Sequence, residues 1–318
     1  MLRTVLEQMD EARAVVGAAP LEGMPSESEP PRAVDAEVVE RATLRCIPVS
    51  GGAVEGFAAF LDGRQESRPL AWLGPVVPLV MGTVSAGIQR REGRRLRSWG
   101  STAVERRIYA PLALIDADRL RRACDPIPVS DTLTGEDDPR GALHPTLLQE
   151  RARQAVARHR ELCEHRMARE WCDTQREPLL VDGGIAGSEA LARSTVAVGV
   201  IKTHRTFYGG GGGMAAALSL GAAERTAVIR IAPRGRTPVY SWYLRLRDPA
   251  AHDAFWGLVR IETAESDDPV ARAELVSRWM LAERVPLAAP DARWDRMAYG
   301  VRGVEQALYA VTGNAWRS

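Results

Sequence analysis

The sequence has few of the residues that build disulfide frameworks, zinc sites or strongly basic surfaces. It holds four cysteines and five histidines in 318 residues, and no two cysteines stand in a C-x-x-C pair. The histidines are not spaced to complete a zinc site. The formal net charge is +1, so nucleic-acid contact would have to come from local clusters rather than from the field of the whole protein. This composition favours a cytoplasmic protein with reduced thiols.

Signals for export or membrane insertion are also missing. The N-terminus carries acids where a signal peptide needs a basic start and an apolar core. Residues 69–88 form a run of 20 residues without a charge, which is close to a membrane-spanning length. Pro75, Pro78 and three glycines interrupt this run, so two short buried strands with a bend are expected there. We expect no membrane span.

The order of apolar patterns predicts an α/β fold with a mixed central sheet flanked by helices. Residues 1–35 are expected to form an N-terminal helix, Leu2–Val16, and a proline-rich arm, and residues 36–318 the main domain. A run of five glycines, 209–213, is expected to be a loop. Strands are predicted at 57–61, 70–73, 76–86, within 96–108, and at 179–182, 196–201, 226–231, 239–246 and 255–261, and helices at 145–172, 270–283 and 302–311.

Two similar motifs, each with an aspartate after an apolar run, are the strongest indication of function in the sequence. Two apolar runs, 57–63 and 178–184, each end in Asp-Gly, which places Asp62 and Asp182 at expected strand ends. One such motif is also a plain turn signal, but these two flank a long helix with Glu150, Glu161, Glu164 and Glu170. Mg²⁺ and Mn²⁺ prefer carboxylate oxygens, and two such ions can activate water and stabilise a leaving oxygen. The pattern therefore predicts metal-assisted phosphodiester chemistry.

A basic cluster lies at the expected turn between two strands. It has two interpretations: a solvated hairpin tip, or a contact with the phosphate backbone of a nucleic acid. At a net charge of +1 we favour the phosphate contact. The cluster consists of Arg90, Arg91, Arg94, Arg95 and Arg97.

The order of these motifs resembles that of the NurA family of prokaryotic DNA end-processing nucleases, from about Gly56 to Ala310. The motifs are Phe60-Leu61-Asp62-Gly63, Arg160-x-x-x-Glu164, Leu179-Leu180-Val181-Asp182-Gly183, Val198-Gly199-Val200-Ile201-Lys202, Tyr243-Leu244-Arg245-Leu246 and Val259-Arg260-Ile261-Glu262. The resemblance implies an RNase H-like core in which Asp62, Asp182 and a helix glutamate bind the metal. Glu164, 18 residues before Asp182, is preferred over Glu161.

Two further residues follow from the same resemblance. Lys202 would lie near the scissile phosphate or pack in the sheet. The family pattern closes with a histidine or acid, and Glu305 is the candidate here because no histidine stands in that stretch. The resemblance implies a Mn²⁺- or Mg²⁺-dependent deoxyribonuclease in DNA repair or anti-phage defence. It would act as a homodimer docked on a hexameric HerA-type ATPase, with the N-terminal helix as a candidate contact.

Two alternatives stay open. The same fold could serve as a catalytically weakened nucleic-acid-binding scaffold, since the expected histidine is missing. A phosphotransferase using a strand-end aspartate would favour a second aspartate two residues on, where Arg64 and Gly184 stand instead.

Overall fold

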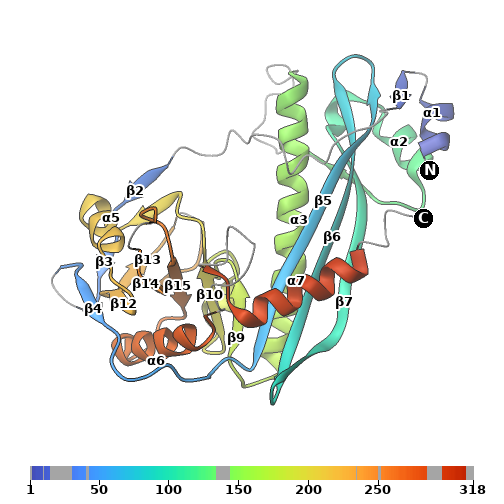
Figure 1. Cartoon of the computed structure of the whole chain (residues 1–318). Helices are drawn as coiled ribbons and strands as arrows, with labels where there is room; N and C mark the ends of the chain where they lie inside the picture. The colour runs from blue at the N-terminus through green and yellow to red at the C-terminus, as the bar shows by residue number, and fades with distance from the viewer. Residues whose placement is uncertain are drawn as a thin grey trace.

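A computed structural model describes residues 2–9, 11–14, 31–40, 43–133, 144–233, 235–249, 252–284 and 296–312. One large mixed sheet runs through the described part of the molecule, in the order β3-β13-β14-β15-β10-β9-β5-β6-β7-β8 (Figure 1). The strands in this order are β3 (Glu37–Val38), β13 (Ile229–Ile231), β14 (Val239–Arg245), β15 (Leu258–Thr263), β10 (Ala197–Ile201), β9 (Leu179–Asp182), β5 (Ala59–Leu73), β6 (Val77–Glu92), β7 (Arg95–Ala110) and β8 (Val129–Asp131), and three short strands pair beside it, β1 (Ala12–Ala14), β4 (Cys46–Pro48) and β12 (Glu224–Thr226).

The middle of this sheet has an RNase H-like order. Strands β5, β6 and β7 form an antiparallel meander, the helix α3 (Pro145–Thr174) follows, and β9 and β10 then add parallel to β5. The spatial order is therefore β7-β6-β5-β9-β10. This arrangement confirms the predicted mixed α/β fold.

The two long strands of the first hairpin differ from the prediction. We expected the first strand to end at Leu61, but β5 continues through Asp62 and Gly63 to Leu73. Asp62 and Gly63 pair with Gly87 and Ala86 of β6, so their backbone groups stay in the ladder after β9 has ended. The strand-end prediction was therefore wrong for Asp62. It was right for Asp182, the last residue of β9.

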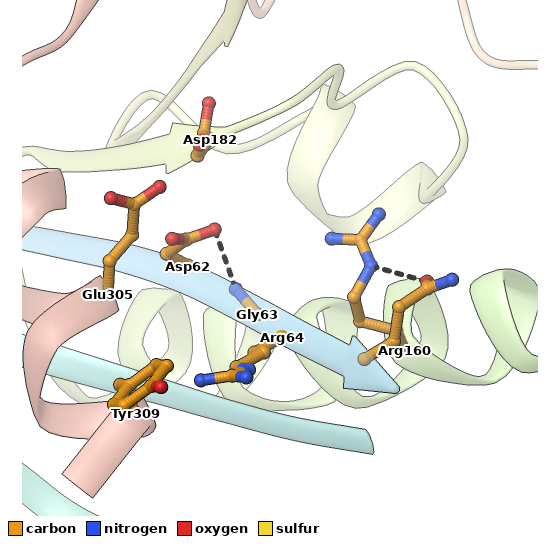
Figure 2. A pocket seen from close by; sticks show the side chains of 8 residues that line it. Asp62, Gly63, Arg64, Arg160, Asp182, Glu305 and Tyr309 are labelled. Atoms are coloured by element: carbon orange, nitrogen blue, oxygen red, sulfur yellow. Dashed lines mark hydrogen bonds between the residues drawn. The ribbon is translucent and has the colours of Figure 1, made fainter. Parts of the chain in front are cut away.

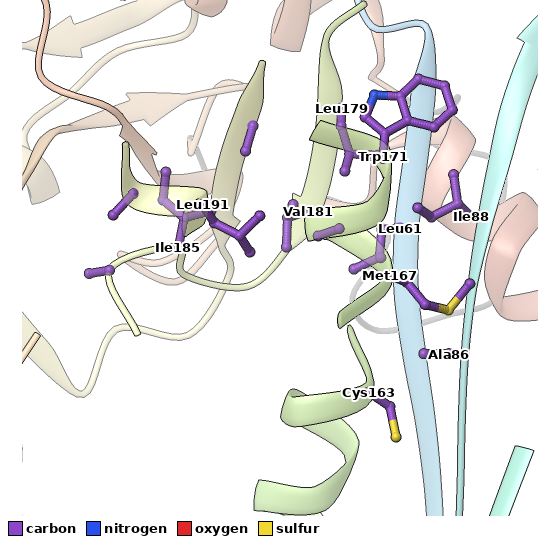
Figure 3. Packing of buried hydrophobic residues seen from close by; sticks show 14 of the residues in the cluster. Leu61, Ala86, Ile88, Cys163, Met167, Trp171, Leu179, Val181, Ile185 and Leu191 are labelled. Carbon is purple, nitrogen blue, oxygen red and sulfur yellow. The ribbon is translucent and has the colours of Figure 1, made fainter. Parts of the chain in front are cut away.

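Helices cover both faces of the meander. α3 was predicted over 145–172 and packs Met167 and Trp171 against Leu61 and Ile88 of the sheet (Figure 3). On the other face lies α7 (Tyr299–Thr312), whereas α6 (Pro269–Ala282) packs beside β14, and both helices lie within a few residues of their predicted bounds. α7 buries Val301, Val304 and Leu308, whose spacing of three and four residues marks one helical face.

The N-terminal segment is part of the fold. Helix α1 ends at Gln8 rather than Val16, because Ala12–Ala14 form strand β1 and pair with the far end of β5. Val5 and Met9 of this segment are buried in a cluster that includes Leu79 and Leu120. The apolar side of α1 therefore has a partner within the chain. Residues 15–30 of the predicted arm lie outside the described residues.

The remaining described elements lie around the large sheet, and two of them, β2 (Arg32–Val34) and β11 (Thr206–Tyr208), pair with each other in a separate two-stranded sheet. The glycine run was predicted to be a loop, but helix α5 begins within it, at Gly210. The run 69–88 forms the β5–β6 hairpin, and no helix in the described part of the chain is long and apolar enough to cross a membrane. All four cysteines are free.

The other elements are a 3-10 helix (Leu112–Leu114), α2 (Ala117–Cys124), α4 (Glu189–Ala192) and α5 (Gly210–Leu218).

Candidate active site

Two aspartates stand side by side where β9 ends. β5 and β9 are parallel, with Leu61 opposite Val181, so the next residues, Asp62 and Asp182, are neighbours on adjacent strands. β5 continues past this level while β9 stops, which leaves open space beside the strand. Two cavities of about 530 and 440 Å³ meet here, and both are lined by Asp62, Asp182 and Arg160 (Figure 2).

The lack of a side chain at Gly63 leaves room for Glu164 of helix α3 in this site. Successive residues of a strand point to opposite faces, so Gly63 faces α3 whereas Asp62 faces α7. A Cβ atom on Gly63 would lie 2.0 Å from Glu164 Oε1. Glu164 thus occupies the space that a side chain at position 63 would need, and it is buried there. Arg160, one turn earlier on α3, donates a hydrogen bond to Glu164 Oε1 and another to Gln65 Oε1 at 3.2 Å.

The other two acids differ in their relation to Asp62. Glu305 comes from α7 and lines the larger cavity together with Asp62 and Asp182 (Figure 2). Glu161, the reserve candidate on α3, has a side chain that is 45% exposed and lies 3.9 Å from His165 Nε2. The structure therefore brings Glu164 and Glu305 to Asp62, whereas Glu161 lines the smaller cavity with a half-exposed side chain.

Lys202 follows β10 and reaches the same centre. Its Nζ donates to Asp182 Oδ2 at 2.8 Å and lies 3.8 Å from Met297 Sδ. The sequence contains 42 lysines and arginines together, and Lys202 is the one lysine among them. A lysine offers a compact charge with three donors that rotate freely, unlike the planar fork of arginine. That compositional signal could have separated Lys202 from the other cations at the outset.

The clustered carboxylates perturb one another. Burial raises the pKa of Asp62 well above its usual range, and the charge of Asp182 adds to this. Lys202 lowers that pKa, and Glu164 and Glu305 raise it. Burial raises the pKa of Glu164 to about 7, against the opposing charge of Arg160. Oxygen-only donors that repel one another are a suitable set for a hard divalent cation, which relieves the repulsion. The residues present fit a hard divalent cation.

A buried glutamate holds the loop that follows Asp182, and sequence reasoning assigned it no role. Glu262 Oε2 accepts hydrogen bonds from the backbone N–H groups of Ile185, at 2.8 Å, and Ala186, at 3.3 Å. Its Oε1 accepts from Arg260 Nη1 at 2.8 Å. Gly199 lies so close to this loop that a Cβ there would come within 2.8 Å of the carbonyl oxygen of Gly183. Arg260 and Glu262 stand two residues apart in an otherwise apolar strand, and this pattern could have indicated the contact from the sequence.

The arginine cluster lies away from the two aspartates. Arg90 is opposite Ala59, roughly 10 Å along β5 before Asp62, and the hairpin tip extends further from the site. Three of the five arginines have acidic partners: Arg90 with Glu177, Arg91 with Glu283, and Arg97 with Glu92. Arg94 and Arg95 are exposed at the tip. DNA contact by this cluster stays a prediction, and it now concerns mainly these two residues.

A second group of metal-ligand residue types lies between β7 and α3. Ligand atoms of Glu105, His159 and Cys163 lie within 4.8 Å of one another, although spacing in the sequence gave no sign of it. Arg166 and Arg107 bind Glu105 and hold its pKa at about 2, while burial raises the pKa of the Cys163 thiol to about 11.

Both ring nitrogens of His159 in that group are already engaged, with Glu105 at 2.9 Å and with the Tyr109 hydroxyl at 2.6 Å. A metal ligand must offer a thiolate or a free lone pair. These contacts therefore describe an internal polar network rather than the reactive centre.

Comparisons with known proteins add one structural similarity. No protein-family model and no curated protein matches the sequence. Among solved structures, the chain is similar to the NurA nuclease from Sulfolobus solfataricus, with a TM-score of 0.45 and 10% sequence identity, over 88% of this chain and 87% of that one. At this TM-score the similarity supports no inference about function, and the geometry of the site itself must carry one.

Proposed function

We propose that the chain is a metal-dependent deoxyribonuclease whose centre is formed by Asp62, Asp182 and Glu164, with Glu305 as a further acid. One observation carries this: four carboxylates from two adjacent strands and two helices converge on one cleft, with a lysine among them. Bound Mn²⁺ or Mg²⁺ would supply an activated water and stabilise charge on the leaving oxygen.

The chain's own residues have separate tasks in this proposal. Asp62, Asp182 and Glu164 would hold the cation from two strands and from α3. Lys202 uses one N–H on Asp182 and a second on Met297 Sδ, and its third donor could meet the negative charge that develops on the phosphate. Arg160 lines both cavities and can orient a phosphate oxygen with the N–H groups that do not bind Glu164 or Gln65.

A second candidate function is a nucleic-acid-binding scaffold with little or no catalysis. It is favoured by two contacts in the structure: Lys202 already pairs with Asp182, and Arg160 with Glu164. If these pairs persisted in the presence of Mn²⁺, the carboxylates would serve packing rather than metal binding.

Cleavage assays separate the two functions. Labelled single-stranded and double-stranded DNA, with RNA of the same sequence, are incubated with the protein and Mn²⁺, Mg²⁺ or EDTA. We expect cleavage of DNA with Mn²⁺ or Mg²⁺ and none in EDTA. The Asp182→Asn variant is the control for a contaminating nuclease, and it should be inactive. Binding without cleavage under every metal condition would favour the scaffold.

The proposed assembly follows from the sequence resemblance and the net charge of +1. We propose a cytoplasmic homodimer that binds a hexameric HerA-type ATPase and acts in DNA repair or anti-phage defence. A neutral nuclease holds DNA weakly, and a ring that threads DNA into it would raise the local concentration of substrate.

Light scattering on the whole chain, alone and mixed with a hexameric HerA-type ATPase, tests this assembly. The expected masses are those of a dimer and of a dimer on a hexamer, and cleavage should rise when ATP is added to the mixture. The whole chain is needed because Val5 and Met9 belong to the core, so removing residues 1–35 would disturb folding. A monomer that ignores the ATPase would contradict the proposal.

A further inference from the structure

An exposed tyrosine and an arginine form a pair beside the carboxylates. Tyr309 on α7 is 65% exposed, yet it lines the same cavity as Asp62 and Glu305 (Figure 2). The guanidinium carbon of Arg64, on β5, lies 4.3 Å from the centre of the Tyr309 ring. An aromatic ring and a cation placed together at the mouth of a cleft offer a stacking surface and a phosphate contact in one place.

The spacing of this pair relates it to the proposed metal centre. Tyr309 follows Glu305 by four residues, which is about 6 Å along one side of a helix. Arg64 follows Asp62 by two residues, which is about 6.6 Å on one face of a strand. Both elements therefore present an acid first and then a member of the Tyr309–Arg64 pair. The distance from the acids to the Tyr309–Arg64 pair is therefore about the length of one nucleotide in an extended strand.

We propose that Tyr309 stacks on the nucleobase next to the scissile phosphate, and that Arg64 contacts the phosphate following it. This rests on the proposed nuclease function and specifies its substrate: a single-stranded or frayed DNA end. A base inside a duplex has both faces covered by its neighbours, so it must leave the stack before an aromatic side chain can contact its face. Stacking on tyrosine tolerates any base, so the subsite selects strand state rather than sequence.

The chain offers a matched control on the same helix. Tyr299 is 58% exposed, but it does not line the cavity that contains Asp62. Truncating either tyrosine removes a largely exposed ring, so both variants should fold and melt like the wild type. Only the substitution of Tyr309 should weaken DNA binding.

Binding of short oligonucleotides with the fluorescent base 2-aminopurine near one end tests the stacking. It is measured in EDTA, where the proposed nuclease does not cleave. Tyr309→Ala should weaken binding of the single strand about tenfold and remove the quenching of 2-aminopurine. Tyr309→Phe should keep both, Tyr299→Ala should match the wild type, and a blunt duplex should show little effect of either change. Equal affinity and equal quenching in the wild type and Tyr309→Ala would overturn the proposal.

The two proposals fail separately in this design. If quenching depends on Tyr309 but the protein never cleaves DNA with Mn²⁺, the stacking site is supported and the nuclease function is contradicted. If cleavage depends on metal but quenching does not depend on Tyr309, the nuclease function is supported and the stacking site is contradicted.

Discussion

Asp62→Asn should abolish Mn²⁺-dependent cleavage of DNA while leaving the protein folded. Asparagine keeps the shape of the side chain but removes the negative charge, and a neutral amide oxygen is a much poorer ligand for a hard cation. We expect a loss of about 1,000-fold or more, which corresponds to roughly 4 kcal/mol of transition-state stabilisation. Rates on labelled single-stranded DNA with Mn²⁺ measure this loss. Cleavage at the wild-type rate would remove Asp62 from the site.

The same substitution should not destabilise the protein in EDTA. The pKa of Asp62 is raised in the folded protein by burial and by Asp182. Its contribution to stability is therefore greatest below the usual pKa of an aspartate and is lost as the pH rises toward the folded pKa. Above the usual pKa of an aspartate, this carboxyl group ionises more readily in the unfolded chain than in the folded protein, which opposes folding. At pH 8 Asp62→Asn should therefore melt at or above the wild-type temperature.

Asp118→Asn is the matched control for that variant. The Asp118 side chain is 77% exposed on α2 and pairs with Arg121, three residues away. It should change neither the cleavage rate nor the melting temperature. A drop in the melting temperature of Asp62→Asn, with Asp118→Asn unchanged, would contradict the charge repulsion inferred at the site.

Glu164→Gln should be far more damaging to cleavage than Glu161→Gln. Glu164 is buried over Gly63 beside Asp62, whereas the Glu161 side chain is 45% exposed. Glutamine preserves the packing at both positions and removes only the charge. We expect a loss of at least about 100-fold for Glu164→Gln and a few-fold at most for Glu161→Gln. An inactive Glu161→Gln with an active Glu164→Gln would move the metal ligand by one turn of α3.

The pH dependence of stability gives a second measurement for Glu164. Its pKa rises from an ordinary 4.5 to about 7 on folding. In EDTA the wild-type protein should therefore lose stability as the pH rises from about 4.5 to 7, by roughly 3 kcal/mol in total. Glu164→Gln should flatten this slope. Mn²⁺ should oppose it, because the cation binds the deprotonated carboxylate and competes with the proton. Identical melting curves for the wild type and Glu164→Gln from pH 5 to pH 8 would contradict this assignment.

Several features of the fold follow from signals that are local in the sequence. Helix α3 was predicted to within two residues of its end, because Pro145 suits a first helical turn and Glu177-Pro178 stops the helix. Strand β9 ends at Asp182 as expected, and Gly183 takes a φ of 137° that few other residues adopt. In these places the residues that determine the backbone are neighbours in the chain.

The prediction failed where a distant segment supplies the missing backbone partner. Asp62-Gly63 carries the same local turn signal as Asp182-Gly183, yet β6 pairs with it and extends the strand. The helical pattern of the N-terminus extends to Val16, but β5 captures residues 12–14 as a strand. Arginines that look free in the sequence are paired with Glu177 and Glu283, which lie 87 and 192 residues away.

The sequence by itself determined the residue types of the site, their order along the chain, and the two strands and one helix on which three of the acids lie. Periodicity and turn chemistry depend on residues a few positions apart, and those were sufficient for this. Only the tertiary structure gave Glu164 and Glu161 different surroundings, because Glu164 occupies the space of the side chain that Gly63 lacks, about a hundred residues earlier, whereas the Glu161 side chain is 45% exposed. It also paired Lys202 with Asp182 and set Tyr309 over Arg64. Such contacts depend on how the sheet and helices pack, which no local pattern records.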